Sequence, residues 1–189
     1  MPASISEYVP QYAGRGASGA AGGRAWAAWA LAAGVAWALV SLLFAAPLAA
    51  SAGHDGAAAT IYRALHVVCH QLPERSFHVA GHPLAVCARC SGIYFGFAAA
   101  ALAYPLVRPL ALADSPARAW LLLSALPLAV DFALGFLGIW ENTHSSRAAT
   151  GALLGAATVF YVIPGLVDLT RVRRRESFRA GALPDGGRN

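Results

Sequence analysis

The sequence has few charged residues, and all of its basic residues are arginines. Only 12% of the 189 residues are charged, and no lysine occurs among the 14 basic residues. Soluble domains carry about twice this charged fraction. Long apolar runs separate the charges, and 58% of the chain is hydrophobic. This composition argues against an ordinary soluble domain and predicts an integral membrane protein.

Four apolar segments are each long enough to cross a bilayer, since a transmembrane helix needs about 20 apolar residues. The predicted spans are about 26–50, 86–108, 119–140 and 148–169. We therefore expect an all-α fold, a polytopic bundle of about four transmembrane helices within one domain, residues 25–170. Residues 1–24 are expected to form a disordered cytoplasmic leader, and residues 171–189 a basic cytoplasmic tail.

The distribution of arginines predicts the orientation. If both termini are cytoplasmic, ten arginines lie inside and four lie outside, namely Arg63, Arg75, Arg89 and Arg147. This excess follows the positive-inside rule and predicts a multi-pass protein of the cytoplasmic (inner) membrane, with its 51–85 loop on the outer face. The net charge of +5 does not indicate nucleic acid, because five arginines directly follow the last span. Residues 1–52 also resemble a cleavable signal, and this alternative stays open.

The outer loop contains a candidate amphipathic helix, residues 57–72. One stripe of this helix is apolar and comprises Ile61, Leu65, Val68 and Leu72. Another stripe carries Tyr62, His66, Cys69 and His70. Such a helix packs on the bundle or lies at the membrane interface. The sequence leaves open whether it is interfacial or inserted.

All three cysteines and four of the six histidines lie between His66 and Cys90. At spacings of three and four residues, helical side chains share a face, and this applies to each half of the cluster. Zn²⁺ binds four such nitrogen and sulfur ligands, although thiolates also suit copper or iron. The sequence predicts a metal site formed by Cys69, His70, Cys87 and Cys90, with His66 and His144 as further candidates. A site with an open position could be catalytic, whereas a closed one is structural or sensory.

Two other roles for the cysteines remain open. Cys87 and Cys90 could be the working pair of a membrane thiol–disulfide oxidoreductase that passes electrons to a quinone, with Cys69 as a partner. Arg89 between them would then lower the pKa values of the thiols. Alternatively, Cys87 forms a structural disulfide with Cys90 or with Cys69. The sequence does not decide whether the protein is an enzyme.

Asp131 lies near the middle of the third predicted span. An intramembrane carboxylate is a candidate functional group, and a small transporter or accessory subunit could use it on an ion or proton path. It could instead be a structural partner of Arg89, Arg147 or Tyr94. The candidate catalytic residues are Asp131, Arg89 and Tyr94. The polar surroundings expected for the metal are Gln71, Arg75, Arg89, Asp131, Asn142 and Arg147.

Two G-x-x-x-G motifs occur in the second and fourth predicted spans, Gly92 to Gly96 and Gly151 to Gly155. Such motifs let helix backbones approach closely within a bilayer. They predict tight helix packing, and they are also candidate contacts with a second copy of the chain or with another membrane protein.

The order of these motifs resembles the prokaryotic membrane-protein family named domain of unknown function 2085. The matching residues are Cys69-His70-Gln71, Arg75-Ser76-Phe77, Cys87, Arg89, Cys90, Gly92, Tyr94, Gly96, Asp131, Asn142, Arg147 and Gly151. The resemblance covers about residues 60–160. In the family pattern a glycine follows the aspartate and a glutamine comes soon after, whereas this chain has Phe132 and no nearby glutamine. The resemblance supports the fold and the choice of site residues, but implies no particular reaction.

Overall fold

The computed structural model describes residues 19–110, 112 and 114–181 and is almost entirely helical. The helices are α1 (Gly19–Ser51), α2 (Asp55–His66), α3 (Ala88–Val107), α4 (Arg118–Phe136) and α5 (His144–Gly181). Between α2 and α3 lie the 3₁₀ turn η2 (Pro73–Arg75) and two short antiparallel strands, β1 (His78–Val79) and β2 (His82–Pro83). The predicted all-α fold is confirmed.

Within the described residues, four helices are long and apolar enough to cross a membrane. The spanning segments are Gly22–Ser51, Ala88–Val107, Arg118–Phe136 and His144–Thr170. They match the four predicted spans to within a few residues. Residues 1–18 of the expected leader and residues 182–189 of the expected tail lie outside the described residues.

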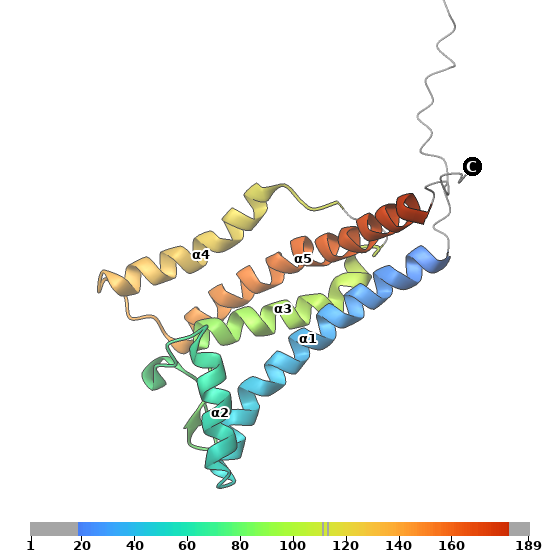
Figure 1. Cartoon of the computed structure of the whole chain (residues 1–189). Helices are drawn as coiled ribbons and strands as arrows, with labels where there is room; N and C mark the ends of the chain where they lie inside the picture. Colours follow the sequence, from blue (N-terminus) through green and yellow to red (C-terminus); the bar gives the residue numbers. More distant parts are fainter. Residues whose placement is uncertain (1–18, 111, 113, 182–189) are drawn as a thin grey trace, which may run out of the picture.

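The bundle has two distinct ends. The start of α1 and the end of α5 lie together at one end, as Figure 1 shows. The other end carries α2 and the connection to α3, and is called here the cysteine end because Cys69, Cys87 and Cys90 lie there. This arrangement follows from four spans that alternate in direction.

Helices α3 and α5 pack backbone against backbone through the two predicted glycine motifs. A Cβ atom added at Gly92 would overlap the carbonyl oxygen of Ala148, and one at Gly155 would overlap that of Ile93. Gly96 and Gly151 are equally tight, so the close approach predicted for these motifs is confirmed. Because the two glycine faces fill each other within one chain, a partner protein would have to use another surface.

Helix α4 lies at the edge of the bundle, beside α5 (Figure 1). None of its residues is buried, although α1, α3 and α5 share a core that includes Ala33, Ala101 and Val159. One of its polar attachments is the hydroxyl of Tyr161 on α5, which donates to the carbonyl oxygen of Ala117 at 2.9 Å. Polar contacts near its ends therefore contribute to holding α4 on the bundle.

The predicted amphipathic helix is shorter than expected. We predicted helix to residue 72, but α2 ends at His66 and the chain then turns through Val67 and Val68. Gln71 has a positive φ of 53°, a left-handed conformation that is incompatible with a continuing α-helix. The prediction that Cys69 and His70 extend a helical face begun by His66 is therefore wrong.

Candidate metal centre

The structure brings the three cysteines together at the cysteine end of the bundle. The Sγ atoms of Cys69, Cys87 and Cys90 all lie within 4.8 Å of one another, and all three are free thiols. Cys69 is buried, and the other two are half-buried. Two segments separated by 17 residues of chain in the sequence thus form one sulfur cluster.

The start of α3 positions two of the sulfurs. Cys87 is the residue before the first helical residue, and Cys90 lies in the first turn, so their side chains point to the same side. The backbone N–H of Cys87 donates to Sγ of Cys69 at 3.2 Å. Cys69 also packs in an apolar cluster with Leu43 of α1 and Leu65 of α2. Apolar burial and one backbone hydrogen bond therefore fix the third sulfur beside the other two.

Gln71 ties the two cysteine-bearing segments together. Its Nε2 donates to the carbonyl oxygen of Tyr62 at 2.8 Å and to that of Ala85 at 2.7 Å. The first acceptor lies in the last turns of α2, and the second lies two residues before Cys87. The sequence predicted Gln71 only as a polar neighbour of the site. Its role as a clamp depends on a partner 14 residues away, which no local pattern reveals.

The environment of Cys87 favours its thiolate. A hydrogen bond from the Cys90 thiol lowers the pKa of Cys87 from its ordinary 9.0 to about 5, against the opposing effect of burial. Weaker contributions come from the backbone N–H groups of Cys90 and Arg89 and from Cys69. We expected the charge of the Arg89 side chain to cause such a shift, but that side chain pairs elsewhere, so this part of the prediction is wrong.

None of the three candidate histidines joins the sulfurs. The side chains of His66 and His70 are exposed, and only the three cysteines form a metal-ligand cluster among the residues that the structure describes. His144 lies instead against the ring of Phe77, with centroids 5.6 Å apart.

Around a tetrahedral Zn²⁺ with Zn–S bonds of about 2.3 Å, sulfurs are about 3.8 Å apart. The observed separations fit such a site after small side-chain movements, with three protein ligands.

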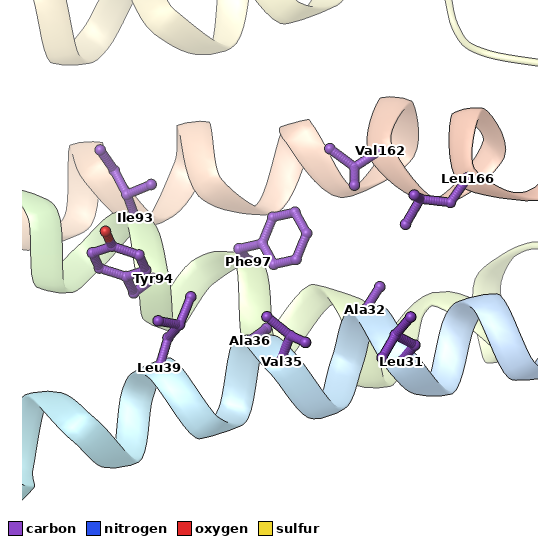
Figure 2. Close-up of a pocket in the computed structure, with 10 residues that line it drawn as sticks. All are labelled: Leu31, Ala32, Val35, Ala36, Leu39, Ile93, Tyr94, Phe97, Val162 and Leu166. Carbon is purple, nitrogen blue, oxygen red and sulfur yellow. The ribbon is translucent and has the colours of Figure 1, made fainter. Parts of the chain in front are cut away.

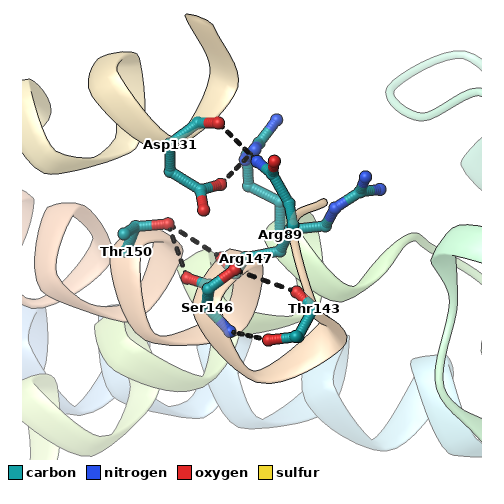
Figure 3. Close-up of polar contacts among 7 residues, drawn as sticks. Arg89, Asp131, Thr143, Ser146, Arg147 and Thr150 are labelled. Atoms are coloured by element: carbon teal, nitrogen blue, oxygen red, sulfur yellow. Dashed lines mark hydrogen bonds and ion pairs between the residues drawn. The ribbon is translucent and has the colours of Figure 1, made fainter. Parts of the chain in front are cut away.

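A salt bridge connects α3 to α4 close to the cysteines. Nη2 of Arg89 donates to Oδ2 of Asp131 at 2.5 Å, with the two side chains 19% and 11% exposed (Figure 3). The guanidinium also lies over the ring of Phe132, 5.5 Å from its centroid. Asp131 lies only five residues before the end of α4, so the predicted position near the middle of this span is wrong. Of its three predicted partners, the structure selects Arg89.

The beginning of α5 completes this polar layer. The hydroxyl of Thr143 accepts the backbone N–H of Ser146 at 3.0 Å, a side-chain cap that explains why α5 begins at His144 (Figure 3). The side-chain amide of Asn142 donates to the carbonyl oxygen of Asp131. Among the described residues, Nε of Arg147 is buried without a hydrogen-bond partner. Arg75, which we expected in this layer, is exposed in η2.

Comparison with known proteins identifies the family. A family model described as "Predicted membrane protein (DUF2085)" matches residues 69–161, from the first cysteine into α5. An uncharacterised protein of Methanothermobacter thermautotrophicus is 33% identical over 102 residues, which are 53% of this chain and 90% of that protein. The chain belongs to this family.

A second relative matches a similar length of the chain. An uncharacterised protein of Methanocaldococcus jannaschii is 38% identical over 104 residues, which cover 55% of this chain and 67% of the relative. No solved structure matches the chain. The family assignment supports a membrane protein and leaves its chemistry to be argued from the site.

Proposed function

We propose that Cys69, Cys87 and Cys90 bind a metal ion, most simply Zn²⁺. The convergence of three sulfurs within 4.8 Å from two chain segments is the observation that carries this proposal. Thiolate sulfur is a preferred ligand of Zn²⁺, and it also suits copper or iron. The lowered pKa of Cys87 is consistent with such a site, although the proposal rests on the geometry.

The fourth position would be free for water or an external ligand. Zinc sites with three protein ligands are typical of catalysis, in which the ion supplies a Lewis acid. The chain's own contribution would be to hold the sulfurs, through the Gln71 clamp and the apolar packing of Cys69. Arg89 and Asp131 would form a fixed polar layer beside the centre.

The centre would lie on the extracytoplasmic side of a cytoplasmic (inner) membrane. The arginines of the chain support this orientation, because most of them flank the end of the bundle opposite the cysteines. Both termini would then be cytoplasmic.

The test is metal analysis of protein purified anaerobically in mild detergent. We expect about one metal ion per chain, lost on Cys87→Ser and on Cys69→Ser. His70→Ala is the matched control and should keep the metal, because the His70 side chain is exposed. Wild-type protein that has three reactive thiols, contains no metal and takes up no added Zn²⁺ would refute the proposal.

A second candidate is thiol–disulfide exchange, favoured by a specific feature of the cluster. Cys87 lies beside two different thiols, so a disulfide with one of them can be attacked by the third. Oxidation of two thiols to a disulfide releases two protons and two electrons, which would reduce a lipid-soluble quinone to the quinol. Metal-free protein with two of its three thiols oxidised, and quinone reduction that depends on Cys87, would establish this candidate in place of the first.

A further inference from the structure

Each spanning helix contains a proline, which has no backbone N–H. The carbonyl oxygen four residues earlier therefore loses its usual donor, and in a bilayer such an acceptor is costly unless another group binds it. The apolar groove of about 460 Å³ between α1, α3 and α5 exposes no polar atom, so it supplies no donor (Figure 2). The freed acceptors are the carbonyl oxygens of Leu43, Ala101, Leu123 and Phe160, which precede Pro47, Pro105, Pro127 and Pro164.

Two of these freed carbonyl oxygens accept a hydrogen bond from another element. The indole Nε1 of Trp29 on α1 donates to the carbonyl oxygen of Ala101 on α3 at 2.7 Å. The backbone N–H of Ala85, in the connection to α3, donates to the carbonyl oxygen of Leu43 on α1 at 3.4 Å. A missing N–H in one helix thus provides the attachment point for another segment.

The attachment of Ala85 matters because this residue lies beside the sulfur cluster. Its N–H binds Leu43, and its carbonyl oxygen accepts Nε2 of Gln71 at 2.7 Å. Ala85 is fully buried, so neither backbone group can turn to water instead. Cys87 follows two residues later, and Leu43 packs in the same apolar cluster as Cys69. The bond from Ala85 to α1 therefore helps to hold the Cys87 segment against the Cys69 sulfur.

We propose that Pro47 is a positioning residue of the sulfur cluster, because it leaves the Leu43 carbonyl oxygen free to anchor Ala85. An N–H at position 47 would share this acceptor. Since a carbonyl oxygen has two lone pairs, the bond to Ala85 would weaken but not disappear. The consequence for metal affinity rests on the proposed function, whereas the anchoring of Ala85 can be measured without metal.

The test compares two replacements at position 47 that differ in a single backbone group. Pro47→Ala introduces an N–H, whereas lactic acid at this position, the hydroxy-acid analogue of alanine, introduces an ester oxygen. Both leave the same side chain and the same space where the proline ring was. In metal-free, full-length protein in mild detergent, the Ala85 amide should exchange with solvent about threefold faster in Pro47→Ala than in the lactate variant. Amide exchange followed by NMR measures this difference.

Metal affinity gives the second readout. Competition with a chelator should show that Zn²⁺ binds about threefold more weakly to Pro47→Ala than to the lactate variant. Pro164→Ala is the matched control, because Pro164 is also fully buried in a spanning helix. In the part of the chain that the structure describes, no other element donates to its freed acceptor, the carbonyl oxygen of Phe160. This control should leave Ala85 exchange and Zn²⁺ affinity as in the wild type.

Three results would overturn the inference. One is equal Ala85 exchange in the alanine and lactate variants, and another is equal Zn²⁺ affinity in the two. The third is a wild-type Ala85 amide that exchanges as fast as an exposed one, a result that requires no variant to fold. Wild-type protein that takes up no Zn²⁺ would refute the proposed function alone, because the exchange comparison is made without metal.

Discussion

The guanidinium of Arg89 donates to the carboxylate of Asp131 across 2.5 Å and so joins the first turn of α3 to α4. This contact matters because α4 has no buried residue of its own. The ring of Phe132 beneath the guanidinium adds a cation–π contact. The arrangement favours a structural role for Asp131 over a place on an ion or proton path.

Asp131→Asn should destabilise the protein by about 2–3 kcal/mol, because it leaves the mostly buried charge of Arg89 without a counter-ion. The residual exposure of the pair keeps this value below that of a fully buried one. Thermal unfolding in detergent measures the effect. The double variant Arg89→Gln with Asp131→Asn should recover part of the loss. If Asp131→Asn unfolds like the wild type, the salt bridge is not structural and the transport hypothesis regains support.

Gly151→Ala should destabilise the bundle by about 1–3 kcal/mol, because the new methyl group would overlap the carbonyl oxygen of Arg89. Gly165→Ala is the matched control on the same helix, since a Cβ there meets nothing within 4 Å. Unfolding temperatures of the two variants in one detergent provide the comparison. Equal values would contradict the close packing of α3 against α5.

Gln71→Ala should loosen the metal centre by removing two hydrogen bonds, at a cost of about 1–3 kcal/mol. Gln71→Gly removes the same bonds but adopts the positive φ of 53° freely. It should therefore be about 1 kcal/mol more stable than Gln71→Ala. Zn²⁺ titration and thermal unfolding report the two effects. Unchanged Zn²⁺ affinity in both variants would show that the clamp does not position the sulfurs.

Alkylation of metal-free protein should show the lowered pKa of Cys87. With a pKa of about 5, its thiolate predominates from about pH 6 upward, so its rate of reaction with iodoacetamide should stay nearly constant to about pH 8. The rate should fall as the pH drops through about 5. Cys90→Ala removes the principal hydrogen-bond donor and should move this midpoint upward. Residue-resolved mass spectrometry measures the rate, and a midpoint near the ordinary 9.0 in the wild type would contradict the structure.

Much of the fold follows directly from the sequence. A bilayer leaves no water for backbone groups, so long apolar runs with few charges must be helices of nearly fixed length. This is why four spans were predicted to within a few residues. The glycine motifs likewise predicted a close approach of backbones, because only a residue without a Cβ atom permits it. The cysteines could be proposed as a site because Cys87 and Cys90 share one helical turn.

The tertiary structure decided which residues meet. Helix α2 ends at His66, so His66 and His70 are exposed and do not join the sulfurs, and Gln71 bonds instead to distant Ala85. The sequence offered three candidate partners for Asp131 and could not distinguish among them. The packing of α4 beside α5 made Arg89 the partner. Helical periodicity is local and visible in the sequence, whereas these contacts depend on how the helices pack and on bonds between residues far apart in the chain.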